Sequence, residues 1–595
     1  MVKKVFAVNS QKQENILSLA MDSTREEREK SGILSVGVNE EEKRWEVIVK
    51  YHGSLERIAS EEIRVEILIA GYAIVTLPEE FLPALAELEE VEYIEKPKSL
   101  VYGLYEAKEN SCLTPVSVPI GELSGKGVLL AVIDSGIDYY LEDFRNQNGS
   151  RILYLWDQGQ EQDTKRGWNP PEGFRVGVEY TKEQIDRALA AEDRKEALNI
   201  VPQQDVTGHG TGVAAVAASS NPEILLQGVA PECELLIVKL RNSKESDFPA
   251  TTELMRAVTY VVRKSLELNR PLVINLSFGN TYGSHDGSSL LERFLDNVSE
   301  IGRSCICVGA GNEGSSGGHF TANVKDIQLV ELAIAERENT TNVQFWKSYE
   351  DDFAIVLITP AGQEFRIEEF DRPVRRKFVF DKTTVLVYIG VPVPYSTKQE
   401  IFFVFLPLQE YINSGIWSFR LEERKVVDGE FQMYLPPERQ RNTGTRFFRQ
   451  SPELTMTIPA TSGRVISVAA YNDSLASYAD FSGRGRQDGF TYLATEGNKP
   501  DLAAPGVGLL AARAGGGTES YTGTSFAAPM VSGSAALLME WGIVRRNDPY
   551  LYGEKLKAYL RKGAKPIRGV QQYPNNRTGW GALCVRESFP ESQRR

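Results

Sequence analysis

The segment 523–529 reads Gly-Thr-Ser-Phe-Ala-Ala-Pro and decides the fold of this chain. The small residues and the apolar stretch 530–541 predict a helix that begins at Ser525. Pro529 is close enough to the start of this helix to be tolerated. Ser525 would then have an exposed hydroxyl in front of the positive end of a helix dipole. This setting suits a nucleophile that must become, or stabilise, an oxyanion.

Two further segments provide the partners that such a serine needs. Val132-Ile133-Asp134-Ser135-Gly136 ends an apolar strand with a carboxylate at its tip. Thr207-Gly208-His209-Gly210-Thr211 places a histidine between glycines at the start of a small-residue helix. A serine hydroxyl becomes nucleophilic when an imidazole takes its proton, and a carboxylate fixes the tautomer of that imidazole. Each segment alone could instead be a turn or a helix cap.

A fourth segment, Gly309-Ala310-Gly311-Asn312-Glu313-Gly314, follows another apolar strand. Together, and in the order Asp, His, Ser, the four segments resemble the subtilisin-like serine proteases. The resemblance implies a catalytic triad of Asp134, His209 and Ser525. It also implies that the side-chain amide of Asn312 donates to the oxyanion.

The composition is that of an ordinary globular protein. The chain has 595 residues, 42% hydrophobic and 25% charged, which predicts three or four domain-sized units. A net charge of -14 argues against nucleic acid as a partner. We expect no secretory signal, and no membrane span because no stretch approaches 18 apolar residues. The five cysteines show no disulfide spacing, so we expect reduced thiols and a location inside the cell or a spore.

The N-terminal residues 1–102 predict a small α+β domain. Residues 45–50 and 64–76 alternate like strands, Leu82–Leu88 is typical of a helix, and Val91–Ile94 of a closing strand. Such a unit resembles the propeptide of the family, which acts as inhibitor and folding template; an accessory domain is the alternative. As a propeptide, its tail Glu95–Tyr102 would lie extended through the active site. Self-cleavage is then expected within 100–110.

The catalytic domain is predicted to be α/β and to consist of residues 103–318 and 459–595. Near-continuous apolar runs indicate strands of a buried parallel sheet flanked by helices. The predicted strands are Val128–Ile133, Leu235–Leu240, Leu272–Leu276, Ser304–Val308 and Val465–Val468, and the predicted helices are 209–219, 251–267 and 288–300. By resemblance, Ser277, Phe278 and Gly279 belong to the substrate-binding strand and line the S1 cleft; they could instead be plain strand-end residues.

Residues 319–458 interrupt the family pattern. The insert is rich in period-2 runs, which predict an all-β sandwich or jelly roll. These runs are Phe353–Ile358, Val385–Ile389, Ile401–Leu406, Ile416–Leu421 and Leu454–Ile458. We expect the insert to be structural and to supply no catalytic group.

The insert and several phrases narrow the resemblance to the clostridial Csp germination proteases. The phrases are Arg151–Gln158, Tyr282–Gly287 and Glu95–Lys98. This resemblance implies a retained propeptide and limited proteolysis of a protein substrate, the zymogen of a spore cortex-lytic enzyme. A general intracellular protease and a largely inactive germination scaffold are the alternatives. Gly212 and Met530 stand where subtilisins usually carry other residues.

We expect neither a metal nor another cofactor. Asp143 aligns with a calcium ligand of secreted subtilisins, but the partner loop Ser219–Gln227 departs from the family pattern. We therefore expect Asp143 to be a solvated carboxylate, with a calcium ligand as the alternative.

Overall fold

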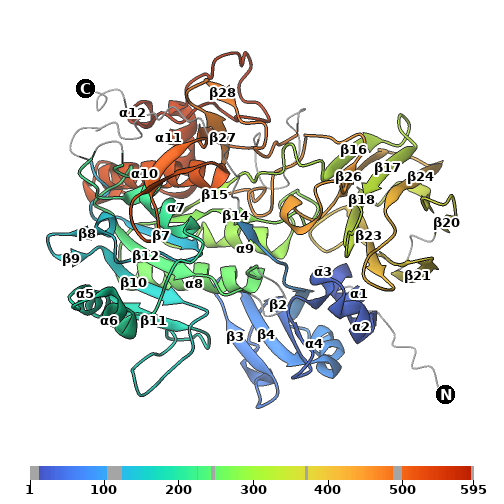
Figure 1. Cartoon of the computed structure of the whole chain (residues 1–595), viewed down its shortest axis with the longest axis horizontal. Helices are drawn as coiled ribbons and strands as arrows, with labels where there is room; N and C mark the ends of the chain where they lie inside the picture. Colours follow the sequence, from blue (N-terminus) through green and yellow to red (C-terminus); the bar gives the residue numbers. More distant parts are fainter. Residues whose placement is uncertain are drawn as a thin grey trace.

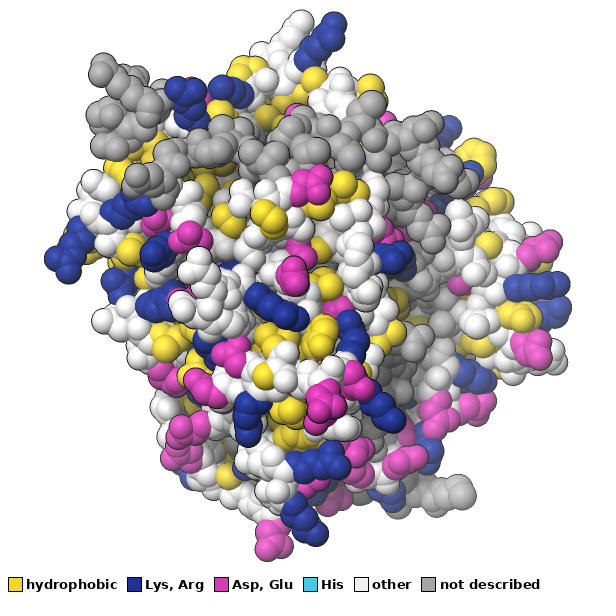
Figure 2. All heavy atoms as spheres, turned by 60° about the vertical axis from the view of Figure 1, so that its left-hand side comes forward, with side chains coloured by type: hydrophobic (Ala, Val, Ile, Leu, Met, Phe, Trp, Pro, Cys, Tyr) yellow, Lys and Arg dark blue, Asp and Glu magenta, His cyan; other side chains and the backbone are white. Residues whose placement is uncertain are grey.

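A computed structural model describes residues 12–102, 123–223, 226–242, 248–368, 373–486 and 499–590. Three bodies of secondary structure lie against one another (Figure 1). An N-terminal α+β part, drawn in blue, and an all-β insert, drawn in yellow-green to orange, both border the larger catalytic part. On the face in Figure 2, charged side chains of the two signs are interspersed.

The catalytic part is built on a mixed nine-stranded sheet. In order across the sheet the strands are β11 (Val178–Thr181), β10 (Ile152–Asp157), β12 (Glu234–Lys239), β7 (Leu129–Asp134), β13 (Leu272–Leu276), β15 (Ser304–Gly309), β27 (Ile466–Asn472) and β28 (Ser477–Tyr478), with β29 (Leu502–Pro505) also pairing with β27. The pairs at β11 and β28 are antiparallel and the others parallel. The predicted strands all occur, and β10 is a strand that the sequence analysis did not predict.

Both faces of this sheet are buried, which explains its near-continuous apolar strands. Leu130 and Val132 of β7 pack with the helices α7 (His209–Ala218) and α10 (Thr524–Met539). Leu129 and Ile133 face the opposite layer, formed by α8 (Thr251–Glu267) and α9 (Leu290–Val298). The three helices predicted here therefore occur, on two different sides of the sheet.

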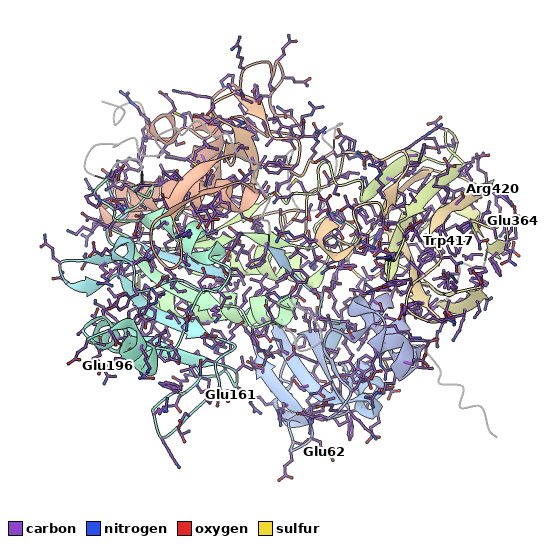
Figure 3. All side chains as sticks on the ribbon, viewed as in Figure 1. Glu62, Glu161, Glu196, Glu364, Trp417 and Arg420 are labelled. Carbon is purple, nitrogen blue, oxygen red and sulfur yellow. The ribbon has the colours of Figure 1, made fainter. Side chains whose placement is uncertain are left out.

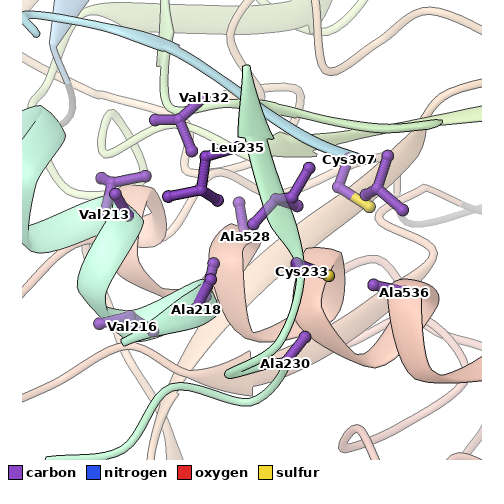
Figure 4. Packing of buried hydrophobic residues seen from close by; sticks show 14 of the residues in the cluster. Val132, Val213, Val216, Ala218, Ala230, Cys233, Leu235, Cys307, Ala528 and Ala536 are labelled. Atoms are coloured by element: carbon purple, nitrogen blue, oxygen red, sulfur yellow. The ribbon is translucent and has the colours of Figure 1, made fainter. Parts of the chain in front are cut away.

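The helix that carries Ser525 runs through the core. Figure 4 shows Ala528 of α10 beside Ala218 of α7, with Ala536 further along α10. Both alanines belong to the same buried cluster as Val213 and Val216. The small residues let α7 and α10 approach closely. The helical stretch Thr524–Val544 is long and apolar enough to cross a membrane by length and composition, but 94% of its apolar window is buried in the protein.

The N-terminal part is a five-stranded antiparallel sheet with short helices. Its strands are β1 (Val38–Asn39), β2 (Arg44–Tyr51), β3 (Arg64–Ile67), β4 (Tyr72–Pro78) and β5 (Val91–Glu95), and its helices are α1 (Asn15–Asp22), α2 (Arg25–Glu29), α3 (Gly32–Ser35) and α4 (Leu82–Glu87). The run 64–76 was predicted as one strand, which is wrong. Ala70 and Gly71 adopt positive φ angles of 61° and 75°, so the chain turns there and forms a hairpin.

The insert consists of two antiparallel sheets that share one hydrophobic core. One sheet has the order β16 (His319–Asn323), β25 (Glu430–Tyr434), β18 (Thr341–Ser348), β23 (Lys398–Pro407), β22 (Thr383–Ile389) and β21 (Val374–Phe380). The other has the order β20 (Glu364–Ile367), β19 (Asp352–Ile358), β24 (Gly415–Lys425), β17 (Leu329–Ile334) and β26 (Arg446–Phe447). Trp417 is fully buried in this core (Figure 3).

One predicted strand of the insert is wrong. Leu454–Ile458 pairs with neither sheet of the insert. Its backbone instead bonds to the catalytic part: Thr457 N–H donates to the Ala310 carbonyl at 3.0 Å, and Ile458 exchanges hydrogen bonds with Asn280. The apolar alternation of this segment therefore reflects burial against the catalytic part.

Candidate active site

Asp134 and His209 are joined directly in the structure. Asp134 is the last residue of β7 and His209 the first of α7. Asp134 Oδ1 lies 2.6 Å from His209 Nδ1, and both side chains are buried. A Cβ atom on Gly210 would lie 2.2 Å from the Gly136 carbonyl oxygen, so only glycine lets α7 start this close to β7.

The buried Asp205 holds the two segments together, and the sequence analysis missed it. Its Oδ1 accepts hydrogen bonds from the Ser135 hydroxyl at 2.8 Å and from the Gly208 N–H at 3.0 Å. Its Oδ2 accepts from the Thr211 N–H at 2.8 Å and the Thr211 hydroxyl at 2.7 Å. An acidic side chain just ahead of a predicted helix start is a recognised signal and could have identified this residue.

Ser525 lies in the first turn of α10, which begins one residue earlier than predicted. Its hydroxyl donates to the Ser277 carbonyl at 2.9 Å, and the Ser277 hydroxyl donates to the Ser525 carbonyl at 2.8 Å. Pro529, four residues further on, has no N–H for the Ser525 carbonyl, so Ser277 takes the place of the missing helix bond. The Ser525 hydrogen must turn away from Ser277 before an imidazole can accept it.

Asn312 is oriented by the same helix start. Its Oδ1 accepts from the backbone N–H of Thr524 at 3.1 Å and from the Thr524 hydroxyl at 3.0 Å. The oxygen end of the amide is therefore fixed on α10. Asn312 and Ser525 line the same cavity, of about 60 Å³.

The predicted substrate-binding strand is paired with the chain's own N-terminal tail. β14 (Phe278–Gly279) pairs antiparallel with β6 (Val101–Tyr102), with Gly279 opposite Val101 and Phe278 opposite Tyr102. On the other side of the tail, Leu100 N–H donates to the Pro249 carbonyl at 2.7 Å. The tail thus lies in the cleft as a third strand, up to Tyr102. The predicted cleavage region 100–110 lies outside the described residues from position 103 onward.

The insert contributes to this cleft, which was not predicted. Pro437, Glu438 and Arg439 line the cavity together with Ser277–Gly279 and the segment that carries Asn312. No local pattern predicts this contact, because Glu438 and Glu313 are 125 positions apart in the sequence.

Asp143 is bonded within the protein. Its Oδ1 accepts from the Ser219 hydroxyl at 2.6 Å. Within the described residues, no group of three or more His, Cys, Asp or Glu side chains is placed to hold a metal ion.

Packing explains why Gly212 stands where subtilisins usually carry another residue. A Cβ atom there would lie 2.7 Å from the ring of Tyr521. That ring stacks on Phe526 with centroids 4.6 Å apart, and the Phe526 ring in turn contacts His209. Tyr521 therefore occupies the space that a larger residue at position 212 would need.

Asp134 thus lies at a strand tip, and His209 and Ser525 lie at the starts of two helices. The chain belongs to the Subtilase family, which matches residues 125–362 and 442–581. Residues 11–98 match the Csp protease B prodomain.

Among solved structures, the chain is similar to the Clostridium perfringens CspB protease. The two are 35% identical with a TM-score of 0.69, and the match covers 78% of this chain and 93% of that one. Among curated proteins, it is 24% identical to the PII-type proteinase of Lactococcus lactis subsp. cremoris over 80% of this chain. It is also 24% identical to the C5a peptidase of Streptococcus pyogenes over 70% of this chain. The chain spans only 26% and 35% of the lengths of these two relatives.

Proposed function

We propose that this protein is a serine endopeptidase that cuts its own chain after the N-terminal part and then acts on a protein substrate. In this proposal His209 takes the proton of Ser525, and Asp134 orients His209 and stabilises its cation. The Asn312 amide and the Ser525 backbone N–H bind the oxyanion. The positive end of α10 favours the same charge.

The observation that carries the proposal is the pairing of Val101–Tyr102 with Phe278–Gly279. An extended peptide added to the edge of a strand is how a protease holds a substrate backbone. Here the peptide belongs to the chain itself, and its Val101 lines the same cavity as Ser525. The tail is therefore the first substrate of the enzyme.

We further propose that the cleaved prodomain stays bound and that the enzyme activates the zymogen of a spore cortex-lytic enzyme. The Csp protease B prodomain and the similarity to the Clostridium perfringens CspB protease support a Csp-type role. The three buried free cysteines Cys233, Cys305 and Cys307 support a reducing location inside the cell or spore. We interpret the two facing sheets of the insert as a jelly roll.

The substitution Ser525→Ala tests the proposal. We expect the wild-type protein to run as two fragments on a denaturing gel and the variant as one full-length chain. Only the wild type should react with a fluorophosphonate. Cleaved Ser525→Ala protein would show that another protease makes the cut. A wild type that is uncleaved and unreactive would favour a scaffold.

A further inference from the structure

A turn of the insert closes the cavity beside Ser525. Pro437, Glu438 and Arg439 follow β25 and form one side of this cavity, whose other sides come from the catalytic part. The same cavity is lined by Val101 of the tail.

The turn is firmly attached to the catalytic part. The Glu438 N–H donates to both carboxylate oxygens of Glu313, at 3.2 and 3.3 Å, and Glu313 directly follows Asn312. Arg441 is buried and donates to the Pro436 carbonyl at 3.0 Å and to the Ser316 carbonyl at 2.9 Å. Both sides of the cavity are therefore held in place relative to Asn312.

The register of the tail identifies which substrate residue the cavity receives. Val101 is opposite Gly279 and Tyr102 opposite Phe278, so a substrate residue that follows Tyr102 in this register would lie opposite Ser277. Side chains two residues apart lie on the same face of a strand. The side chain of that residue would point into the cavity that Val101 lines, next to Ser525.

The cavity is small. Its volume is about 60 Å³, whereas an apolar cavity that binds benzene measures about 150 Å³. The sequence has a glycine at position 103, the residue after Tyr102. A short side chain suits this space and an aromatic ring does not.

We propose that the insert turn Pro437–Arg439 forms the outer wall of the S1 pocket and restricts the residue before the scissile bond to a short side chain. This inference rests on the proposed endopeptidase function. In this proposal Arg439 touches no reacting atom. Its side chain limits the size of the pocket. The insert then helps to select the substrate, beyond the structural role that we expected for it.

Self-cleavage of the full chain is the test, since its own tail is the substrate. Residue 103 is changed to Ala, Leu or Phe, and the cut is followed on gels over time and located by intact mass. We expect a cut after residue 103 in the wild type and in Gly103→Ala. We expect Gly103→Leu and Gly103→Phe to be cut at least ~10-fold more slowly.

Adding Arg439→Ala to Gly103→Phe should restore cleavage at least ~10-fold, because the wall is shortened. The matched control is Arg420→Ala, an arginine of the same insert that lies at its outer end beside Glu364 (Figure 3). Adding Arg420→Ala to Gly103→Phe should not restore cleavage. Circular dichroism of every variant shows that the protein is folded.

Three results would overturn the inference while leaving the endopeptidase function intact. These are rapid cleavage of Gly103→Phe, no effect of Arg439→Ala, or a cut at a different bond. A wild type that neither cuts itself nor reacts with the fluorophosphonate would instead overturn the proposed function.

Discussion

The reciprocal bonds between Ser277 and Ser525 connect the substrate strand to the nucleophile. Asn275 Nδ2 donates to Ser277 Oγ at 2.9 Å, and the Ser532 hydroxyl donates to Asn275 Oδ1 at 2.9 Å. Ser277 is thereby held between β13 and α10 at the point where Pro529 leaves a carbonyl without a helix partner. Its position depends on this network as well as on the strand.

The substitution Ser277→Ala should therefore destabilise the protein. It removes the donor to the Ser525 carbonyl and leaves that buried oxygen unsatisfied, which costs about 1–3 kcal/mol. Urea unfolding of the Ser525→Ala form with and without Ser277→Ala measures the change without self-cleavage. Ser396→Ala, which removes a hydroxyl of the insert that bonds to Asp286 and not to the Ser525 carbonyl, is the control. An unchanged unfolding midpoint would show that the Ser277 hydroxyl does not support α10.

At the scale of elements, the catalytic strands and helices could be predicted because both faces of the sheet are buried. In such a sheet, a near-continuous apolar run such as Leu272–Leu276 predicts a buried strand. The hairpin at Ala70-Gly71 was missed because apolar and polar residues alternate in both of its strands. Leu454–Ile458 was misread because burial against the catalytic part produces the same pattern as a strand.

The candidate triad could be predicted from local motifs, and the position of Asp205 ahead of a helix start is a local signal too, whereas the long-range contacts of the supporting residues could not be predicted. Asp205 lies in a polar stretch, and its bonds to Ser135 and Thr211 appear only after folding. The Glu438 contact joins positions 125 residues apart in the sequence. No local pattern indicates a contact at such a separation.

The prodomain sheet docks on α8 through a buried arginine. Arg256 of α8 donates to Glu66 at 2.9 Å and to Glu46 at 2.7 Å, and it also pairs with Glu253 of its own helix at 3.2 Å. Tyr72 and Ile74 of β4 add an apolar contact with the same layer of helices. One cation thus neutralises carboxylates from both sides of the interface.

We expect Arg256→Ala to release the prodomain after self-cleavage. Removing the cation leaves buried carboxylates unpaired, which costs about 3–5 kcal/mol. The roughly 100-residue fragment should co-elute with the remainder on size exclusion for the wild type and separate for the variant. The control is Arg25→Ala, whose exposed side chain pairs within α2. Co-elution of the Arg256→Ala fragments would show that apolar contacts suffice.

At the scale of the whole molecule, the three bodies meet at one buried acidic cluster. Lys98 Nζ lies 2.7 Å from both Glu14 Oε1 and Glu95 Oε1, where the tail enters the cleft. Glu95 Oε2 accepts from the first N–H of α9 at 3.0 Å. Glu400 of the insert accepts from Asn15 of α1 at 3.0 Å. Prodomain, insert and catalytic part are thus linked through three carboxylates and one lysine.

Burial raises the pKa of Glu14 to about 7, against the opposing effect of Lys98. Burial, with the nearby Glu14, raises the pKa of Glu400 to about 8. Both carboxyls bind a proton more tightly in the folded protein than in the unfolded chain, where their ordinary pKa is 4.5. Their contribution to stability is therefore fully present below about pH 4.5 and is lost as the pH rises through about 7 to 8.

Retention of the cleaved prodomain should therefore weaken between pH 5 and pH 9. The Glu400→Gln variant keeps an oxygen for Asn15 but carries no proton to lose, so it should make retention less dependent on pH. Size exclusion of the cleaved wild type and the cleaved variant at several pH values measures the fraction of prodomain that co-elutes. Glu62→Gln, an exposed glutamate of the prodomain (Figure 3), should behave as the wild type. If the prodomain of the wild type is held equally at pH 5 and pH 9, this cluster joins the three bodies without responding to pH.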